Sequence, residues 1–458
     1  MPGLHVLIEI EDDNAGALEA FSEATKSSAE AERQASRILA DIGGEGIEFE
    51  EGFTPVPMFS APEAPLPEGF ALEMSPGEAK RRPTGQTVVL PAEVSRSRLD
   101  DLQSRDGVKV WPNSALTLYG HDAAIDDARS DGGVDCRPFR DPVEIDTIRA
   151  MLAVDALWDD GFRGQNIVVG ILDEGVSGQH YPVIGGFARP EAGLQPGSAA
   201  VTSHGSMCAA DVLVAAPAAR LYDYPFLGIP RSGGAIQMFQ AVLDQWNTDG
   251  TPQITNNSYG FVGIPDPAQF PDHEVNNINH PVHRKVREVV TAGVACFFAA
   301  GNCGENCPSG NCHPSGIGPG LSIHASNSLE EVITVAAVNS RHERVGYSSQ
   351  GPGRFEQVKP DVASYTHFLG NYGPGRPAGT AVSAFDSGTS AATPVAAGVA
   401  AALLSAIPTS TPLQIKDALI SSAIDIGSTV GWDPNHGHGV INAAAALAAL
   451  ERSGALVG

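Results

Sequence analysis

The chain has 458 residues, of which 42% are hydrophobic, and it contains 51 glycines and 34 prolines. A chain of this length can bury a large core, and this composition excludes disorder over the whole length. The formal net charge of -26 opposes binding to nucleic acid and to anionic membranes, so neutral or basic polypeptides are the expected partners.

The first 120 residues predict a small domain of strands and helices. Strands are expected at residues 4–10, 47–53, 87–94 and 108–119, and helices at 15–42 and 95–106. Residues 54–83 contain seven prolines and are expected to form a long loop. The order strand, helix, strand, strand, helix, strand is typical of a ferredoxin-like α+β unit.

The segment that follows this small domain predicts a connection. Residues 121–145 are polar and acidic with two adjacent glycines, which is typical of an exposed linker. The opening residues have no basic leader, so no secretory signal is predicted and a cytoplasmic location is expected, with non-standard export left open. Residues 391–407 form the longest run of small apolar residues, which is too short and alanine-rich to predict a membrane span.

Residues 146–458 predict one large α/β domain. Apolar spacing over residues 145–158 predicts its first helix. Strands are then expected near residues 166–176, 219–226, 253–260, 294–302 and 331–338, with helices near 234–246 and 280–292. Continuous apolar strands that alternate with helices favour a parallel sheet with helices on both faces, in which chemistry gathers where the strands end.

Four polar residues stand at such positions. Asp173 ends a buried strand, His204 opens a helix of small residues, and Asn302 follows another apolar strand. Ser390 lies in FDSGTSAATPVAAGVAA, where a loop turns into a buried helix, with Pro394 expected in the first helical turn. Each residue has a structural alternative: a turn aspartate, a core histidine, a turn asparagine or a helix-capping serine.

The sequence G-T-S-A-A-T-P around Ser390 resembles the nucleophile segment of subtilisin-like serine proteases. The segments around Asp173, His204 and Asn302 resemble this family's aspartate, histidine and oxyanion segments, and the order Asp, His, Ser is the family's order. The resemblance covers residues 145–450. It implies a subtilisin-like fold and a serine endopeptidase that acts through an acyl-enzyme at neutral to mildly alkaline pH. Glu174 departs from the pattern, because a small hydroxyl residue is usual there.

The same resemblance implies how a polypeptide substrate is bound. Ser258, Tyr259 and Gly260 match the strand that contacts the substrate backbone, and Phe261 either narrows the specificity pocket or packs under a loop. The N-terminal domain resembles the family's propeptide, which implies an intramolecular inhibitor and a self-inhibited precursor. Self-processing is expected between residues 119 and 129. The alternatives are a catalytically inactive or peptide-binding module, and a variant that ligates or cyclises peptides.

Cysteines and metals leave several possibilities open. Cys303, Cys307, Cys312 and His313 lie in one short loop after Asn302, and they suggest a zinc site, a local disulfide or free thiols. Six cysteines in a long chain without a secretory signal do not predict a disulfide scaffold. No cofactor and no catalytic metal are expected. Structural calcium is common in the resembling family, but no calcium ligands are assigned in this chain.

Overall fold

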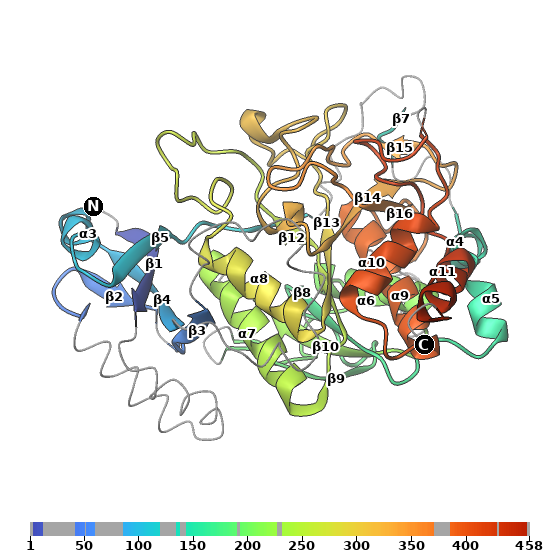
Figure 1. Ribbon diagram of the computed structural model, residues 1–458, viewed down its shortest axis with the longest axis horizontal. Helices are drawn as coiled ribbons and strands as arrows, with labels where there is room; N and C mark the ends of the chain where they lie inside the picture. Colours follow the sequence, from blue (N-terminus) through green and yellow to red (C-terminus); the bar gives the residue numbers. More distant parts are fainter. Residues whose placement is uncertain are drawn as a thin grey trace.

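The computed structural model describes residues 3–11, 42–50, 52–59, 86–119, 134–137, 143–189, 193–226, 231–370, 385–427 and 430–455. These residues form a smaller N-terminal domain, in blue at the left of Figure 1, and a larger domain that contains the C-terminus.

The N-terminal domain is an antiparallel sheet with a helix. The strands are β1 (Leu4–Glu11), β2 (Ile47–Phe49), β3 (Val56–Phe59), β4 (Gln86–Val94) and β5 (Val108–Pro112), and the helix is α3 (Arg96–Gln103). The order β2-β4-β1-β5 agrees with the expected ferredoxin-like arrangement. Most of the helix expected at residues 15–42 lies outside the described residues.

One part of this domain differs from the expectation. Residues 56–59, expected in a long loop, form β3 and pair with β4 from Val56 opposite Val89. Val56 and Met58 are buried, and their alternation gives this short segment one apolar face despite the neighbouring prolines. Most of the rest of the proline-rich passage lies outside the described residues.

The large domain contains a nine-stranded, mostly parallel sheet. Its order is β7-β15-β14-β13-β11-β8-β10-β9, and β16 also pairs with β14. The strands are β7 (Val134–Asp135), β8 (Val168–Asp173), β9 (Val183–Gly186), β10 (Arg220–Pro225), β11 (Ile254–Asn257), β13 (Ala295–Ala299), β14 (Ile333–Val338), β15 (Arg344–Val345) and β16 (Val362–Tyr365). Only the β14–β15 pair is antiparallel among these strands.

Helices cover both faces of this sheet, as its continuous apolar strands predict. On β8, Val169 and Ile171 belong to one core and Val168 and Leu172 to the other. The first core includes residues of α4 (Ile145–Leu152), α5 (Val154–Asp159), α6 (His204–Ala215), α9 (Thr389–Ala406), α10 (Pro412–Ser421) and α11 (Ala443–Ala455). The second includes residues of α7 (Ser232–Asp249) and α8 (Pro281–Ala292).

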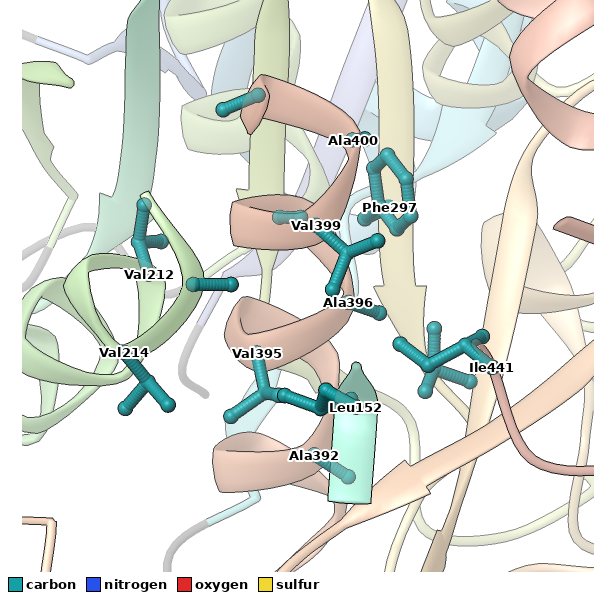
Figure 2. Packing of buried hydrophobic residues seen from close by; sticks show 14 of the residues in the cluster. Leu152, Val212, Val214, Phe297, Ala392, Val395, Ala396, Val399, Ala400 and Ile441 are labelled. Atoms are coloured by element: carbon teal, nitrogen blue, oxygen red, sulfur yellow. The ribbon is translucent and has the colours of Figure 1, made fainter. Parts of the chain in front are cut away.

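Helix α9 runs through the first core. Its valines and alanines pack among Val212, Phe297 and Ile441 (Figure 2). A side chain at Gly398 would place its Cβ 2.2 Å from the backbone oxygen of Val212, so glycine is required for this approach to α6. Within the described part of the chain, α9 alone is long and apolar enough to cross a membrane, yet 89% of its apolar window is buried inside the protein. We therefore interpret α9 as a core helix.

Two expected segments differ from the structure. The helix expected over residues 145–158 is divided into α4 and α5, because Ala153 adopts a left-handed conformation with φ of 57°. Residues 134–137, expected in an exposed linker, include β7, which pairs with β15 of the large sheet. Cys136 is 1% exposed, so this part of the segment is anchored in the large domain.

Candidate active site

Asp173 and His204 meet at the edge where β8 ends and α6 begins. The Asp173 carboxylate is fully buried, and its two oxygens lie 2.8 and 2.9 Å from Nδ1 of His204. A carboxylate accepts the Nδ1 proton, so the neutral imidazole carries its lone pair on Nε2. Nε2 is buried and makes no hydrogen bond to any described residue. The pair therefore presents an oriented histidine that can accept a proton.

Glu174 adds a second negative group beside this histidine. Its side chain accepts a hydrogen bond from the backbone N–H of His204, at the positive end of α6. Burial lowers the pKa of His204, but the charge and hydrogen bond of Asp173, followed by the charge of Glu174, raise it above its ordinary value. The residue that departs from the family pattern thus strengthens the basicity of His204.

Ser390 and Asn302 converge on a single backbone oxygen, that of Tyr119. The Ser390 hydroxyl donates to this oxygen at 2.7 Å, and Nδ2 of Asn302 donates to it at 2.6 Å. The Asn302 amide is oriented by Thr389, whose backbone N–H and hydroxyl donate to its Oδ1 at 3.0 and 2.9 Å. A side-chain amide that is fixed by two hydrogen bonds and donates to a carbonyl oxygen is the kind of donor that an oxyanion hole uses.

The start of α9 differs from the expectation for Pro394. Gly388 caps the helix with φ of 86°, Ser390 is its second residue, and Pro394 is its sixth, beyond the first turn. Because proline has no N–H, the Ser390 carbonyl loses its usual partner four residues later. The Ser258 hydroxyl donates to this carbonyl at 3.3 Å, and the Cys208 thiol lies 3.5 Å from it. Pro394 thus leaves the Ser390 carbonyl available for contacts with Ser258 and Cys208.

The segment that ends at Tyr119 lies along the edge of the site as an added strand. β6 (Thr117–Leu118) pairs antiparallel with β12 (Tyr259–Gly260), and the Tyr119 N–H donates to the Ser258 oxygen at 3.1 Å. A Cβ at Gly260 would lie 2.0 Å from Oη of Tyr119, so glycine is needed there. The three residues predicted to bind substrate backbone therefore contact this segment.

The Tyr119 side chain fills a closed pocket. It is 3% exposed, and its hydroxyl donates to the Phe261 backbone oxygen at 3.2 Å. The Phe261 ring packs edge-on against His273, with 5.7 Å between the ring centres. The Phe261 ring thus packs against the loop that contains His273, while its backbone oxygen contacts the Tyr119 side chain.

These motifs belong to a known family. The model of the Subtilase family matches residues 164–442. The chain belongs to the subtilase family.

Several bacterial subtilisins are similar to this subtilase. Subtilisin DY of Bacillus licheniformis is 28% identical over 305 residues, which cover 65% of this chain and 96% of that protein. Subtilisin E of Bacillus subtilis (strain 168) is 29% identical over 312 residues, which cover 65% of this chain and 70% of that protein.

Solved structures share the fold of this subtilase. The crystal structure of fervidolysin from Fervidobacterium pennivorans, a keratinolytic enzyme related to subtilisin, matches with a TM-score of 0.56 at 18% identity. That match covers 98% of this chain and 61% of fervidolysin. A lanthipeptide protease matches with a TM-score of 0.51 at 21% identity, over 66% of this chain and 95% of that protein. At these identities the matches support the fold alone.

Four cysteines of this subtilase form two disulfides in and beside the loop that follows Asn302. Cys303 pairs with Cys312, and Cys307 pairs with Cys136, 171 residues away in sequence. The zinc and free-thiol interpretations of this loop are therefore wrong, and the local disulfide is present. The sequence did not predict Cys136 as a partner, because a pairing over such a separation depends on the tertiary fold.

Asp173, His204 and Cys208 lie close enough together to suggest a metal site, with their ligand atoms within 4.8 Å of one another. A metal needs a thiolate, but burial raises the pKa of the Cys208 thiol well above its ordinary value. The imidazole nitrogen nearest the carboxylate is already bonded to it. We therefore interpret this cluster as a hydrogen-bonded pair with a neighbouring neutral thiol.

Two supporting groups were missed by the sequence interpretation. Asp223 on β10 accepts hydrogen bonds from the backbone N–H groups of Val176 at 3.0 Å and Gly197 at 2.8 Å, and so holds the chain between β8 and α6. Burial raises its pKa to about 6. Tyr347 accepts a hydrogen bond from the Gly388 N–H at 2.7 Å, which fixes the turn before Ser390. The available sequence signal for Asp223 was a carboxylate between two tyrosines of the expected strand β10.

Proposed function

We propose that this subtilase is a serine endopeptidase, with Ser390 as nucleophile, His204 as base and Asp173 as the group that orients His204. We further propose that it is made as a precursor inhibited by its own N-terminal domain. The observation that supports both is the position of the Tyr119 carbonyl, whose oxygen lies within hydrogen-bond distance of the Ser390 hydroxyl and the Asn302 amide.

The reaction would use His204 and Asn302 in the orientations that they already have. His204 Nε2 takes the Ser390 proton as the hydroxyl oxygen attacks a peptide carbonyl, and Asp173 stabilises the imidazolium that forms. The Asn302 amide holds the negative oxygen of the tetrahedral intermediate. His204 then gives its proton to the departing amine, and water hydrolyses the acyl-enzyme by the same steps. The serine hydroxyl must first turn from the Tyr119 oxygen towards Nε2.

The bound segment also suggests where the precursor is cut and what the enzyme prefers. The peptide bond after Tyr119 is the one whose carbonyl lies between Ser390 and Asn302, so self-cleavage there would separate residues 1–119 from residues 120–458. This cut falls at the start of the range expected from the sequence. Because the Tyr119 ring is enclosed and its hydroxyl is bonded, we expect substrates with tyrosine before the cleaved bond to be favoured.

Self-cleavage can be tested directly. Purified full chain should yield fragments with the intact masses of residues 1–119 and 120–458, whereas Ser390→Ala should stay uncut, with a loss of turnover of about 10⁶-fold. Ser309→Ala, in the neighbouring cysteine loop, is the control and should be cut like the unaltered chain. Identical cleavage of the Ser390→Ala chain would refute the assignment of the nucleophile. Joined or cyclised products from an unstructured polypeptide would instead favour the ligating alternative.

A further inference from the structure

Glu274 is a buried carboxylate in the loop before α8. Its side chain is fully buried, and it accepts hydrogen bonds from the Ser114 backbone N–H at 2.8 Å and the Ser114 hydroxyl at 2.8 Å. The Ser232 hydroxyl donates to it at 2.6 Å. Burial acts to raise the pKa of Glu274, but His280, His273 and these hydrogen bonds lower it below its ordinary value. A charged acceptor thus binds Ser114, the sixth residue before the proposed cut.

The N-terminus of α7 lies beside this carboxylate and is capped by another segment. Its own N-cap residue, Arg231, makes no side-chain cap. Instead, Oδ1 of Asn113 accepts a hydrogen bond from the Gly233 N–H at 2.9 Å, and the Asn113 side chain is 2% exposed. Asparagine is among the most favoured capping residues, because its oxygen satisfies an N–H that the helix leaves unpaired. The seventh residue before the cut therefore has a specific hydrogen-bond partner.

Backbone contacts connect these two residues to the reacting groups. Arg231 donates from its side chain to the Asn113 oxygen at 3.1 Å, and the Ser232 N–H donates to the Ser114 oxygen at 3.1 Å. Leu116 is 9% exposed and packs in the second core, and β6 continues the contact to Tyr119. Residues 113–119 thus lie in one continuous, extended contact with the large domain.

We propose that Glu274, Ser232 and Gly233 form a distal substrate subsite that selects polypeptides with an asparagine and a serine, or residues of the same hydrogen-bonding chemistry, seven and six positions before the cleaved bond. This inference depends on the proposed peptidase function. All three groups belong to the large domain, so they remain in place when the N-terminal domain leaves. A substrate that enters later meets the same carboxylate and the same helix end.

The alternative is that these contacts serve only to hold the enzyme's own N-terminal domain. A free peptide separates the two interpretations, because it carries the segment without the domain. The self-processed full chain is given internally quenched peptides with the sequence WPNSALTLYGHDA, which copies residues 111–123. Companion peptides carry alanine in place of Asn113, of Ser114 or of both. A peptide with Ala115→Ser is the matched control, since Ala115 is exposed.

Each single replacement should lower kcat/KM by about fivefold, and the double replacement by more, while the Ala115→Ser peptide should stay within about twofold. The loss should appear mainly in KM, because these hydrogen bonds are made equally in the bound substrate and in the transition state. In a Glu274→Gln enzyme, the Ser114 peptide and its alanine form should approach the same kcat/KM. The peptide comparison on the unaltered enzyme keeps the test decisive if this variant does not fold.

Suppose that the enzyme cleaves the parent peptide and its three alanine forms after tyrosine with equal kcat/KM. This result would overturn the distal subsite and leave the proposed peptidase function intact. A chain that neither processes itself nor cleaves any peptide or unstructured polypeptide would overturn both. The two failures are therefore distinguishable.

Discussion

The large domain buries both faces of its sheet beneath its own helices, whereas the N-terminal sheet relies on the large domain for one of its faces. On β1, Val6 and Ile8 pack in the N-terminal core, while Leu7 between them belongs to the core that includes α7 and α8. A Cβ at Gly233 on α7 would lie 3.1 Å from Leu7. The large domain thus contains a complete sheet and all the proposed catalytic groups, and the N-terminal domain would expose an apolar face if it left.

A charged group is buried in the same interface. Glu9 on β1 is 6% exposed, forms an ion pair with Arg284 on α8 and accepts a hydrogen bond from the Trp111 indole at 2.6 Å. Separating a buried ion pair leaves a charge without its partner, so this pair favours the arrangement in which β1 and α8 are in contact. The N-terminal domain is therefore held by apolar packing and by a specific polar contact, both away from the Tyr119 oxygen that Ser390 and Asn302 contact.

Among variants that keep the proposed nucleophile, the largest expected effect is confined to the large domain. Asn302→Ala removes one oxyanion donor, so kcat should fall by about 10²–10³ with little change in KM. Steady-state cleavage of a tyrosine peptide by the processed enzyme measures this effect. Asn311→Ala, exposed in the same loop, should change neither constant. An Asn302→Ala enzyme with unchanged kcat would contradict the proposed role of the amide.

A smaller effect is expected at the interface. Glu9→Ala leaves the Arg284 charge without this carboxylate, and the lost contact should weaken docking by about 3 kcal/mol, or about 10² in affinity. Samples are taken at intervals after self-cleavage and separated by size-exclusion chromatography. Fragment 1–119 of the Glu9→Ala chain should be released from the enzyme after a shorter time than in the unaltered chain, and peptidase activity should rise correspondingly sooner. Glu48→Ala, exposed on β2, is the control. Equal release times for both variants would contradict the comparison between the two domains.

The smallest effect concerns the pH profile of the large domain. The charge of Glu174 raises the pKa of His204, and Glu174→Gln keeps an acceptor for the His204 N–H while removing that charge. In this variant the lower pKa of His204 keeps the imidazole neutral at lower pH. The acidic limb of the pH profile of kcat/KM should therefore shift to lower pH, by less than about one pH unit. Glu330→Gln, exposed on a loop, should leave the limb in place. An upward shift would contradict this sign.

Much of the fold and the proposed site could be predicted because their signals are local. Asp173 and Asn302 follow continuous apolar strands, and parallel strands bring such ends to one edge. Ser390 and His204 lie at the starts of helices that are rich in small residues, which is typical of closely packed, buried helices. The contact of Gly398 on α9 with the backbone of α6 is an example of such packing. The orientation of the Asn302 amide was not predictable, since it depends on hydrogen bonds from Thr389, which is 87 residues away from Asn302 in sequence.

Features that depend on distant contacts escaped prediction. Pro394 lies beyond the first turn because α9 already begins at Thr389, and the Ser258 hydroxyl donates to the Ser390 carbonyl that the proline leaves without its usual partner. Residues 134–137 have a polar, linker-like neighbourhood, and only pairing with β15 makes them part of the sheet. The cytoplasmic location remains a prediction; disulfides are typical of oxidising compartments and weigh against it.

The Cys136–Cys307 disulfide determines what becomes of the two products of a cut after Tyr119. All six cysteines lie beyond Tyr119, so no sulfur bridge joins the fragments, and they would separate on a gel without reducing agent. Cys136, which follows the new amino terminus by 16 residues in sequence counting from residue 120, would stay bonded to Cys307 in the large domain. Departure of the N-terminal domain would thus require no reductant, while the segment that contains Cys136 would stay covalently attached to the enzyme.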